Sequence, residues 1–183
     1  MKSQEETFRN LNQDVIDGCK KGDSKAQFQL YKLYYRSMYN TCLRILNDPA
    51  EAEDVMQEAF LSAFEKIKTY EGKVSFGSWL KKIVVNRSLD ALRKRKMDLI
   101  DIKEQTGPAI LDEEKINEDE INFKVQKVKD AMTQLPEGYR LVLTLYLFEG
   151  YDHDEIAQIL NISGSTSRSQ YTRARQKLLQ LMK

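Results

Sequence analysis

Helix-breaking residues are scarce in this chain of 183 residues, which contains 8 glycines and 3 prolines. A turn-rich β-sandwich uses both residue types more often, whereas a charged fraction of 31% favours long surface helices. Hydrophobic residues make up 41% of the chain, which is sufficient to bury a core and argues against a disordered tail protein. The composition therefore predicts an all-α fold.

Residues for disulfides, metal binding and catalysis are also few. Cys19 and Cys42 show no CxxC spacing, so we expect neither a disulfide framework nor a zinc site. The single histidine, His153, stands at a predicted helix start, where its expected role is that of a solvent-exposed neighbour of the helix cap. No carboxylate accompanies a partnered nucleophile. The sequence thus predicts no cofactor, no metal and no catalytic residue, and hence a protein that is not an enzyme.

Long apolar runs are missing as well. The longest nearly apolar run covers residues 141–148, far fewer than the roughly 20 residues that a membrane-spanning helix needs. The first twelve residues are polar and mixed in charge, unlike an export signal. We therefore expect a cytoplasmic protein without membrane insertion.

Formal charges nearly cancel, to a net charge of +1, yet the cations are clustered. Binding of nucleic acid depends on neutralising phosphates, so the net charge alone argues against it. One cluster near a predicted helix end contains Arg87, Arg93, Lys94, Arg95 and Lys96, and another contains Arg168, Arg173, Arg175 and Lys177. Two such clusters on either side of an acidic stretch predict two surfaces that face nucleic acid. For either cluster alone, a solvated helix face stays the alternative.

Apolar periodicity and helix-breaking residues predict two helical domains. In residues 1–96 we expect four helices, over 11–20, 23–46, 49–70 and from 75 or 78 to 96. Asp23 is expected to cap the second helix, and Ser75 or Ser78 is expected to open the fourth. The apolar stripe of the second helix, from Phe28 to Ile45, is expected to lie in the core. Residues 97–120 are acidic and aperiodic, which predicts a flexible linker. In residues 121–183 we expect helices over 121–135 and 136–148, a short one capped by Asp152 with Glu155, and one over 165–182.

Residues 155–170 have the pattern of a helix-turn-helix. Small Ala157 permits a close helix crossing, Asn161 tolerates a left-handed turn, and Ile162 is expected to plug the core. The next helix begins with short polar residues that can approach base edges in a groove. Our candidate DNA contacts on it are Ser165, Thr166, Ser167, Arg168, Ser169, Gln170, Arg173 and Arg175. The alternative is a helical hairpin that only packs in the core and does not bind DNA, and the arginines argue against it.

These residues resemble a known family. Residues 160–178 resemble the final helix-turn-helix of bacterial sigma factors, especially the extracytoplasmic-function group. Residues 48–60 look like that group's polymerase-binding helix, and residues 76–95, with Ser78-Trp79-Leu80 and Asn86-Arg87, look like its promoter-opening helix. Residues 135–140 resemble the start of its second domain. The motifs cover most of residues 23–180 in the family's order.

The resemblance assigns roles to residues of the first domain. It implies that one helix edge docks on the clamp helices of the largest subunit of core RNA polymerase, with the candidate contacts Asp54, Gln57, Glu58 and Leu61; a solvated acidic face is the alternative. It also implies readers of the minus-ten element. The candidates there are Lys73, Phe76, Lys82, Asn86, Arg87, Arg93 and Lys94, beside aromatic residues suited to stacking unpaired bases. Trp79 itself we assign to the core.

The second domain departs from the family at two positions. Ser167 stands where valine is usual, and Gln170 where arginine is usual, so the minus-thirty-five sequence cannot be borrowed from relatives. The loss of valine is also expected to weaken the packing of this helix.

The predicted function is that of a transcription initiation factor. A linker of roughly 24 residues spans at most about 80 Å, which exceeds two turns of DNA at about 34 Å each. The second domain is expected to read duplex DNA upstream, while the first traps the unpaired non-template strand. The resemblance further implies an inhibitory anti-sigma factor as a partner. The linker threads a basic channel of the polymerase or acts as a soluble spacer.

Two other classes of protein remain alternatives. An ordinary helix-turn-helix regulator is expected to bind a palindromic site as a symmetric dimer without polymerase. A sigma-like decoy is expected to bind polymerase without starting transcription. The acidic docking helix argues against the first alternative, and Gly72, Lys73, Asn86 and Arg87 argue against the second.

Overall fold

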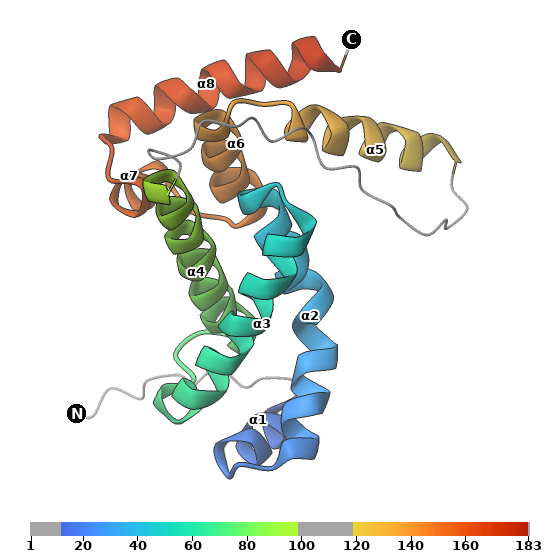
Figure 1. Cartoon of the computed structure of the whole chain (residues 1–183), viewed down its shortest axis with the longest axis vertical. Coiled ribbons are helices and arrows are strands. Elements are labelled where there is room, and N and C mark those ends of the chain that lie inside the picture. Colours follow the sequence, from blue (N-terminus) through green and yellow to red (C-terminus); the bar gives the residue numbers. More distant parts are fainter. Residues whose placement is uncertain (1–11, 99–118, 183) are drawn as a thin grey trace, which may run out of the picture. The chain divides into compact units, whose positions relative to one another are not determined.

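The computed structural model describes residues 12–98 and 119–182, and every regular element within these ranges is a helix (Figure 1). The chain divides into two compact units, with the boundary between residues 104 and 105. The predicted all-α fold is confirmed. The predicted linker over 97–120 lies outside the described residues except for its two-residue ends.

The first unit consists of α1 (Gln13–Lys20), α2 (Ser24–Leu46), α3 (Pro49–Lys66), a 3-10 turn η1 (Ile67–Thr69) and α4 (Phe76–Asp98). Helices α2, α3 and α4 pack against one another, and α1 packs on α2. The predicted helix starts are confirmed: the side chain of Asp23 accepts from the backbone N–H of Lys25, and that of Asp48 accepts from Glu51, each at 2.9 Å. Of the two serines offered for α4, Ser75 caps the helix, because its Oγ accepts from the N–H of Ser78.

The core of the first unit confirms only part of the expected stripe on α2. Leu30, Cys42 and Ile45 are fully buried, but Phe28 and Leu33 are 60% and 53% exposed. With about 100° of rotation per residue, Phe28 and Leu33 point about 100–120° away from the middle of the buried stripe. Their assignment to the core was therefore wrong.

The second unit consists of α5 (Asp119–Thr133), α6 (Glu137–Leu143), a π-helical segment η2 (Thr144–Phe148), α7 (His153–Leu160) and α8 (Gly164–Leu181). Helices α5, α6 and α7 all contact α8. Met132, Leu135, Leu143 and Ala174 form a core, against which Tyr139, Tyr171 and Leu178 pack. Tyr171, Ala174 and Leu178 therefore lie on the inward side of α8.

One predicted helix of this unit differs from its expected form. The helix expected over 136–148 has Pro136 as its N-cap and changes at Thr144 into a π-helix. The N–H of Glu149 reaches the carbonyl of Thr144 at 3.1 Å, which is the wider spacing of a π turn. As a result Thr144 and Leu145 are buried, whereas residues 146–148 stay exposed. Within the described ranges, no helix is both long and apolar enough to cross a membrane.

Candidate nucleic-acid interface

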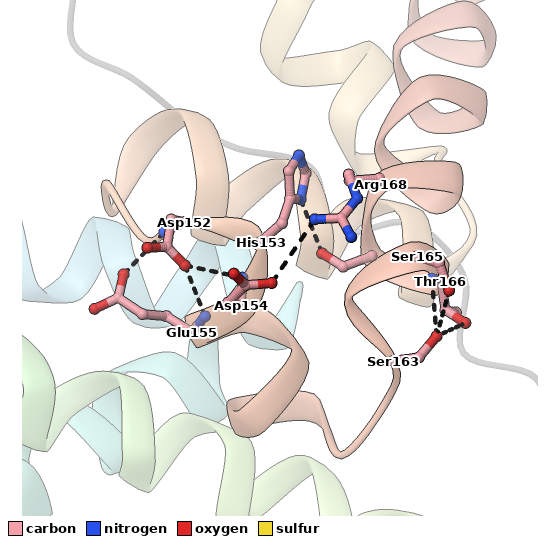
Figure 2. A network of polar contacts seen from close by, with 9 residues as sticks. Asp152, His153, Asp154, Glu155, Ser163, Ser165, Thr166 and Arg168 are labelled. Carbon is pink, nitrogen blue, oxygen red and sulfur yellow. Dashed lines mark hydrogen bonds and ion pairs between the residues drawn. The ribbon is translucent and has the colours of Figure 1, made fainter.

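The helix-turn-helix formed by α7 and α8 is built by local hydrogen bonds. Asp152 and Glu155 form a capping box at the start of α7: Asp152 accepts from the N–H of Glu155 at 2.8 Å, and its own N–H donates to Glu155 Oε2 at 2.9 Å (Figure 2). Asn161 adopts the left-handed conformation with φ of 53° and turns the chain. Ser163 then caps α8 by accepting from the N–H of Thr166 at 3.1 Å. The predicted cap by Asp152 and Glu155 and the predicted turn at Asn161 are confirmed, whereas α8 begins at Gly164 and not at Ser165 as expected.

The predicted DNA contacts on α8 differ in accessibility. Ser165, Arg168, Ser169, Arg173 and Arg175 are exposed, while Thr166 and Gln170 are half-buried. Ser167, in contrast, is fully buried, with 0% exposure. Its inclusion among the base-contacting residues was wrong, because a buried hydroxyl offers no surface to DNA.

Ser167 is instead held by the only histidine of the chain. His153 Nδ1 lies 2.9 Å from Ser167 Oγ. The imidazole stacks on the Tyr146 ring at a centroid distance of 4.6 Å and meets the edge of Tyr171 at 5.6 Å. The expectation of a solvent-exposed His153 was therefore wrong, because the half-buried imidazole packs between α7 and α8. No local sequence pattern predicts this contact, because the two residues are 14 positions apart.

The next pair of residues is an exposed ion pair between the same two helices. Arg168 Nη1 lies 3.7 Å from Asp154 Oδ1, with side chains 59% and 82% exposed. Figure 2 shows Arg168 reaching from α8 toward Asp154 at the start of α7. The guanidinium and the hydroxyl-rich first turn of α8 thus share one exposed surface, which suits the recognition of an edge of a base pair or a phosphate.

In the first unit, an aromatic cluster supports the loop before α4. Ring centroids of Tyr70, Phe76 and Trp79 lie 5.4 Å from one another in each pairing, and the Tyr70 hydroxyl donates to the carbonyl of Val74 at 2.6 Å. Phe76 is only 1% exposed, so its assignment as a DNA contact was wrong. Trp79 is half-buried in the cluster. These rings hold the loop in place, and Phe76 presents no face to a base.

The cations predicted to face DNA in the first unit lie on this loop and on α4. Lys73 pairs with Glu71 at 2.7 Å, and this contact lowers the pKa of Glu71 and raises that of Lys73. The predicted residues Lys82, Asn86, Arg87, Arg93 and Lys94 are all exposed. At about 100° per residue, Lys82, Asn86 and Arg93 share one side of α4. This side could follow a nucleic-acid strand along the helix.

Three arginines near this surface have partners within the first unit. Arg93 Nη1 forms an exposed ion pair with Asp90 at 2.8 Å. Arg87 Nη2 donates to Ser62 Oγ at 3.4 Å. Arg95 Nη1 forms an ion pair with Glu51 at 3.0 Å and reaches the carbonyl of Leu46 at 3.4 Å. Arg95 therefore ties α4 to the start of α3. The exposed cations at this end of α4 are Arg93, in its ion pair with Asp90, and Lys94.

The four residues expected to contact polymerase share one face of α3. Asp54, Gln57, Glu58 and Leu61 are all exposed, and their spacing of three and four residues places them along one side of the helix. Leu61 is 65% exposed at the end of this row. An exposed leucine bordered by carboxylate and amide groups suits the docking of another helical surface.

Among the described residues, no group of three or more histidine, cysteine, aspartate or glutamate side chains is arranged to hold a metal ion.

Comparison with known proteins gives two family matches. The Sigma-70 region 2 family matches residues 30–97, and the Sigma-70, region 4 family matches residues 126–178.

Similar whole proteins agree with these matches. The ECF RNA polymerase sigma factor SigW of Bacillus subtilis is 30% identical over 175 residues, which cover 89% of this chain and 92% of SigW. The RNA polymerase sigma-H factor of Pseudomonas aeruginosa is 30% identical, with 91% of each chain covered. Among solved structures, the sigma factor RpoE of Bartonella quintana, in complex with the anti-sigma factor NepR, has a TM-score of 0.62 at 23% identity. That match covers 84% of this chain and 94% of RpoE and shows the fold.

Proposed function

This chain belongs to the ECF RNA polymerase sigma factors, and we propose on that basis that it is a transcription initiation factor that binds core RNA polymerase and directs it to specific promoters. The observation that carries the proposal is the presence of both sigma-70 regions on one chain, each with an exposed cationic surface. Nucleotide addition belongs to the polymerase in this scheme, so the chain performs no catalysis of its own.

The second unit, with the proposed domain 121–183, reads the minus-thirty-five element as duplex DNA. Ser165, Arg168 and Ser169 are exposed on the first turns of α8, where recognition helices approach base edges. Arg173 and Arg175 are exposed further along the helix and neutralise phosphates. Base contacts supply the sequence preference, and phosphate contacts set the register.

The first unit, with the proposed domain 1–96, acts on the minus-ten element. Lys82, Asn86 and Arg93 lie along one exposed side of α4, and Lys73 is exposed on the preceding loop. Cations at these positions hold the backbone of the unpaired non-template strand, and Asn86 supplies amide donors and acceptors for a base. Holding an unpaired base offsets part of the unstacking cost of a few kcal/mol, which couples sequence choice to melting.

The exposed face of α3 docks on the clamp helices of the polymerase's largest subunit. Leu61 supplies the apolar contact, and Asp54, Gln57 and Glu58, which precede it on the same side of the helix, supply polar contacts. Residues 97–120 then connect the two DNA-reading domains, either through a basic channel of the polymerase or as a spacer. An anti-sigma factor that covers these surfaces is the proposed inhibitor, and the cytoplasm, where polymerase and DNA meet, is the proposed location.

A reconstituted transcription assay tests the proposal. The purified chain is mixed with core polymerase and genomic DNA fragments, and the 5′ ends of the transcripts are sequenced. We expect starts that core polymerase alone does not make. Binding to core without new starts would identify a decoy, and binding to a palindromic duplex without polymerase would identify an ordinary regulator; either result contradicts the proposal.

A further inference from the structure

Two neighbouring contacts join the start of α7 to α8. His153 contacts Ser167 at 2.9 Å, and Asp154 contacts Arg168 at 3.7 Å. The first contact includes the fully buried Ser167, whereas both members of the second are exposed. The backbone of Asp154 is also fixed, because its N–H donates to Asp152 Oδ1 at 2.8 Å (Figure 2). The buried contact therefore sets the register in which the exposed ion pair forms.

Gly164, the first residue of α8, leaves the space that this ion pair occupies. A Cβ at position 164 would lie 2.9 Å from Asp154 Oδ1 and 3.3 Å from Arg168 Nη2. Contacts below 3.0 Å are essentially never observed for a Cβ, so one of the two charged groups would have to move. The pair and the missing side chain at 164 thus belong to one arrangement.

We propose that Asp154 is a positioning residue for promoter recognition: it holds Arg168 so that the free edge of the guanidinium meets a base rather than a phosphate. The inference rests on the proposed function and adds to it a residue outside the recognition helix. The guanidinium has five donors, so a carboxylate on one side leaves donors for the O6 and N7 acceptors of a guanine.

The charge and the geometry of Asp154 favour selectivity over affinity. An exposed arginine samples many rotamers, and ordering it on DNA costs entropy that a preformed ion pair reduces. The same carboxylate repels phosphates, so it disfavours complexes in which Arg168 contacts only the backbone. Asp154 therefore strengthens binding to the correct site relative to binding to any duplex.

The test measures a selectivity ratio with the intact holoenzyme. The probes are a promoter fragment chosen from the sequenced transcript starts and the same fragment with its upstream element scrambled, and the ratio of their dissociation constants is determined in competition. Arg168→Ala is expected to lower the ratio by about tenfold or more, as for loss of a base contact. Asp154→Asn is expected to lower it about two- to five-fold, the range for an exposed ion pair.

Two further variants separate positioning from simple charge. Gly164→Ala keeps every charge but places a Cβ against the pair, and we expect it to lower the ratio as Asp154→Asn does. Asp130→Asn changes the net charge of the same unit equally, at an exposed residue whose side chain contacts Gln126, and should leave the ratio unchanged. Asp154→Asn combined with Arg168→Ala should lose no more selectivity than Arg168→Ala alone, because the two residues act as one unit.

The outcomes are distinguishable. If Asp154→Asn strengthens binding to both fragments equally, Asp154 merely competes with DNA for Arg168, and the inference is overturned; an unchanged ratio overturns it too. If Arg168→Ala lowers selectivity while Asp154→Asn does not, the proposed function survives and only the positioning role fails. If the wild-type holoenzyme itself does not distinguish the fragments, the proposed function fails at its upstream contact.

Discussion

His153 Nδ1 and the fully buried Ser167 Oγ are joined by a hydrogen bond of 2.9 Å between the two helices of the helix-turn-helix. A serine in a core is stable only when its hydroxyl has a partner. His153 provides that partner and also stacks on Tyr146. The recognition helix is therefore attached to the preceding helix by a polar contact at a position where the family usually has an apolar one.

This contact predicts the stability of three variants. His153→Ala leaves the Ser167 hydroxyl buried without its partner and should lower the free energy of unfolding by about 1–3 kcal/mol. Ser167→Ala removes the group that needs a partner and should cost less. The double variant should be more stable than the sum of the two losses predicts, because its members share one contact. Urea denaturation of the full chain measures all three, and strictly additive losses would contradict the coupling.

Phe76 and Asn86 were both predicted to contact DNA, but the burial of Phe76 predicts that their substitution affects stability differently. Phe76→Ala empties a core position among Tyr34, Tyr70 and Trp79 and should lower the free energy of unfolding by about 3–5 kcal/mol. Asn86→Ala removes an exposed side chain and should change it by less than about 0.5 kcal/mol. Asn86→Ala should nevertheless reduce promoter opening, measured by the reactivity of unpaired thymines. Normal opening with Asn86→Ala would remove this residue from the proposed strand-binding surface.

The exposed face of α3 predicts a variant that fails to bind polymerase. Asp54→Ala combined with Gln57→Ala removes two polar contacts beside Leu61 and should weaken binding to core polymerase about tenfold, without loss of folding. Asp14→Ala, which removes an exposed carboxylate on α1, serves as the control and should bind normally. Titration of labelled core polymerase measures both. Equal weakening by both variants would indicate an effect of total charge rather than a docking face.

Burial of the two cysteines predicts slow thiol chemistry. Cys19 and Cys42 are 2% and 0% exposed, and burial, together with the nearby Asp23, raises the pKa of the Cys19 thiol. A raised pKa lowers the thiolate fraction at any given pH, so a disulfide reagent should react slowly with the folded chain. In urea, where the chain is unfolded, both thiols should react rapidly. Rapid reaction in native buffer would mean that α1 opens readily.

The signals that sequence analysis interpreted correctly all act over a few residues. Asp23, Asp48 and the Asp152–Glu155 box cap their helices as predicted, and Asn161 turns the chain. Each depends on a side chain that reaches a backbone group two or three positions away, so the local order of residue types is enough to identify it. The sigma-factor motifs belong to the same class, because they are read from residue order.

The errors concern contacts between residues far apart in the chain. Arg95 was grouped with DNA-facing cations, but it pairs with Glu51, 44 positions earlier. Phe28 and Leu33 fit an apolar stripe, yet α3 and α4 cover only one side of α2, and that side was unknown beforehand. Serine at position 167 looked like a surface residue until its histidine partner was visible.

Residue order alone determined that this chain forms helices, where they begin, and which family it resembles, since propensities, caps and motifs act within a few positions. Tertiary packing decided which side of each helix meets solvent, and so which of the proposed residues are available to DNA. Periodicity indicates the apolar side of a helix only approximately, and long-range pairing depends on how helices cross, which no single helix encodes.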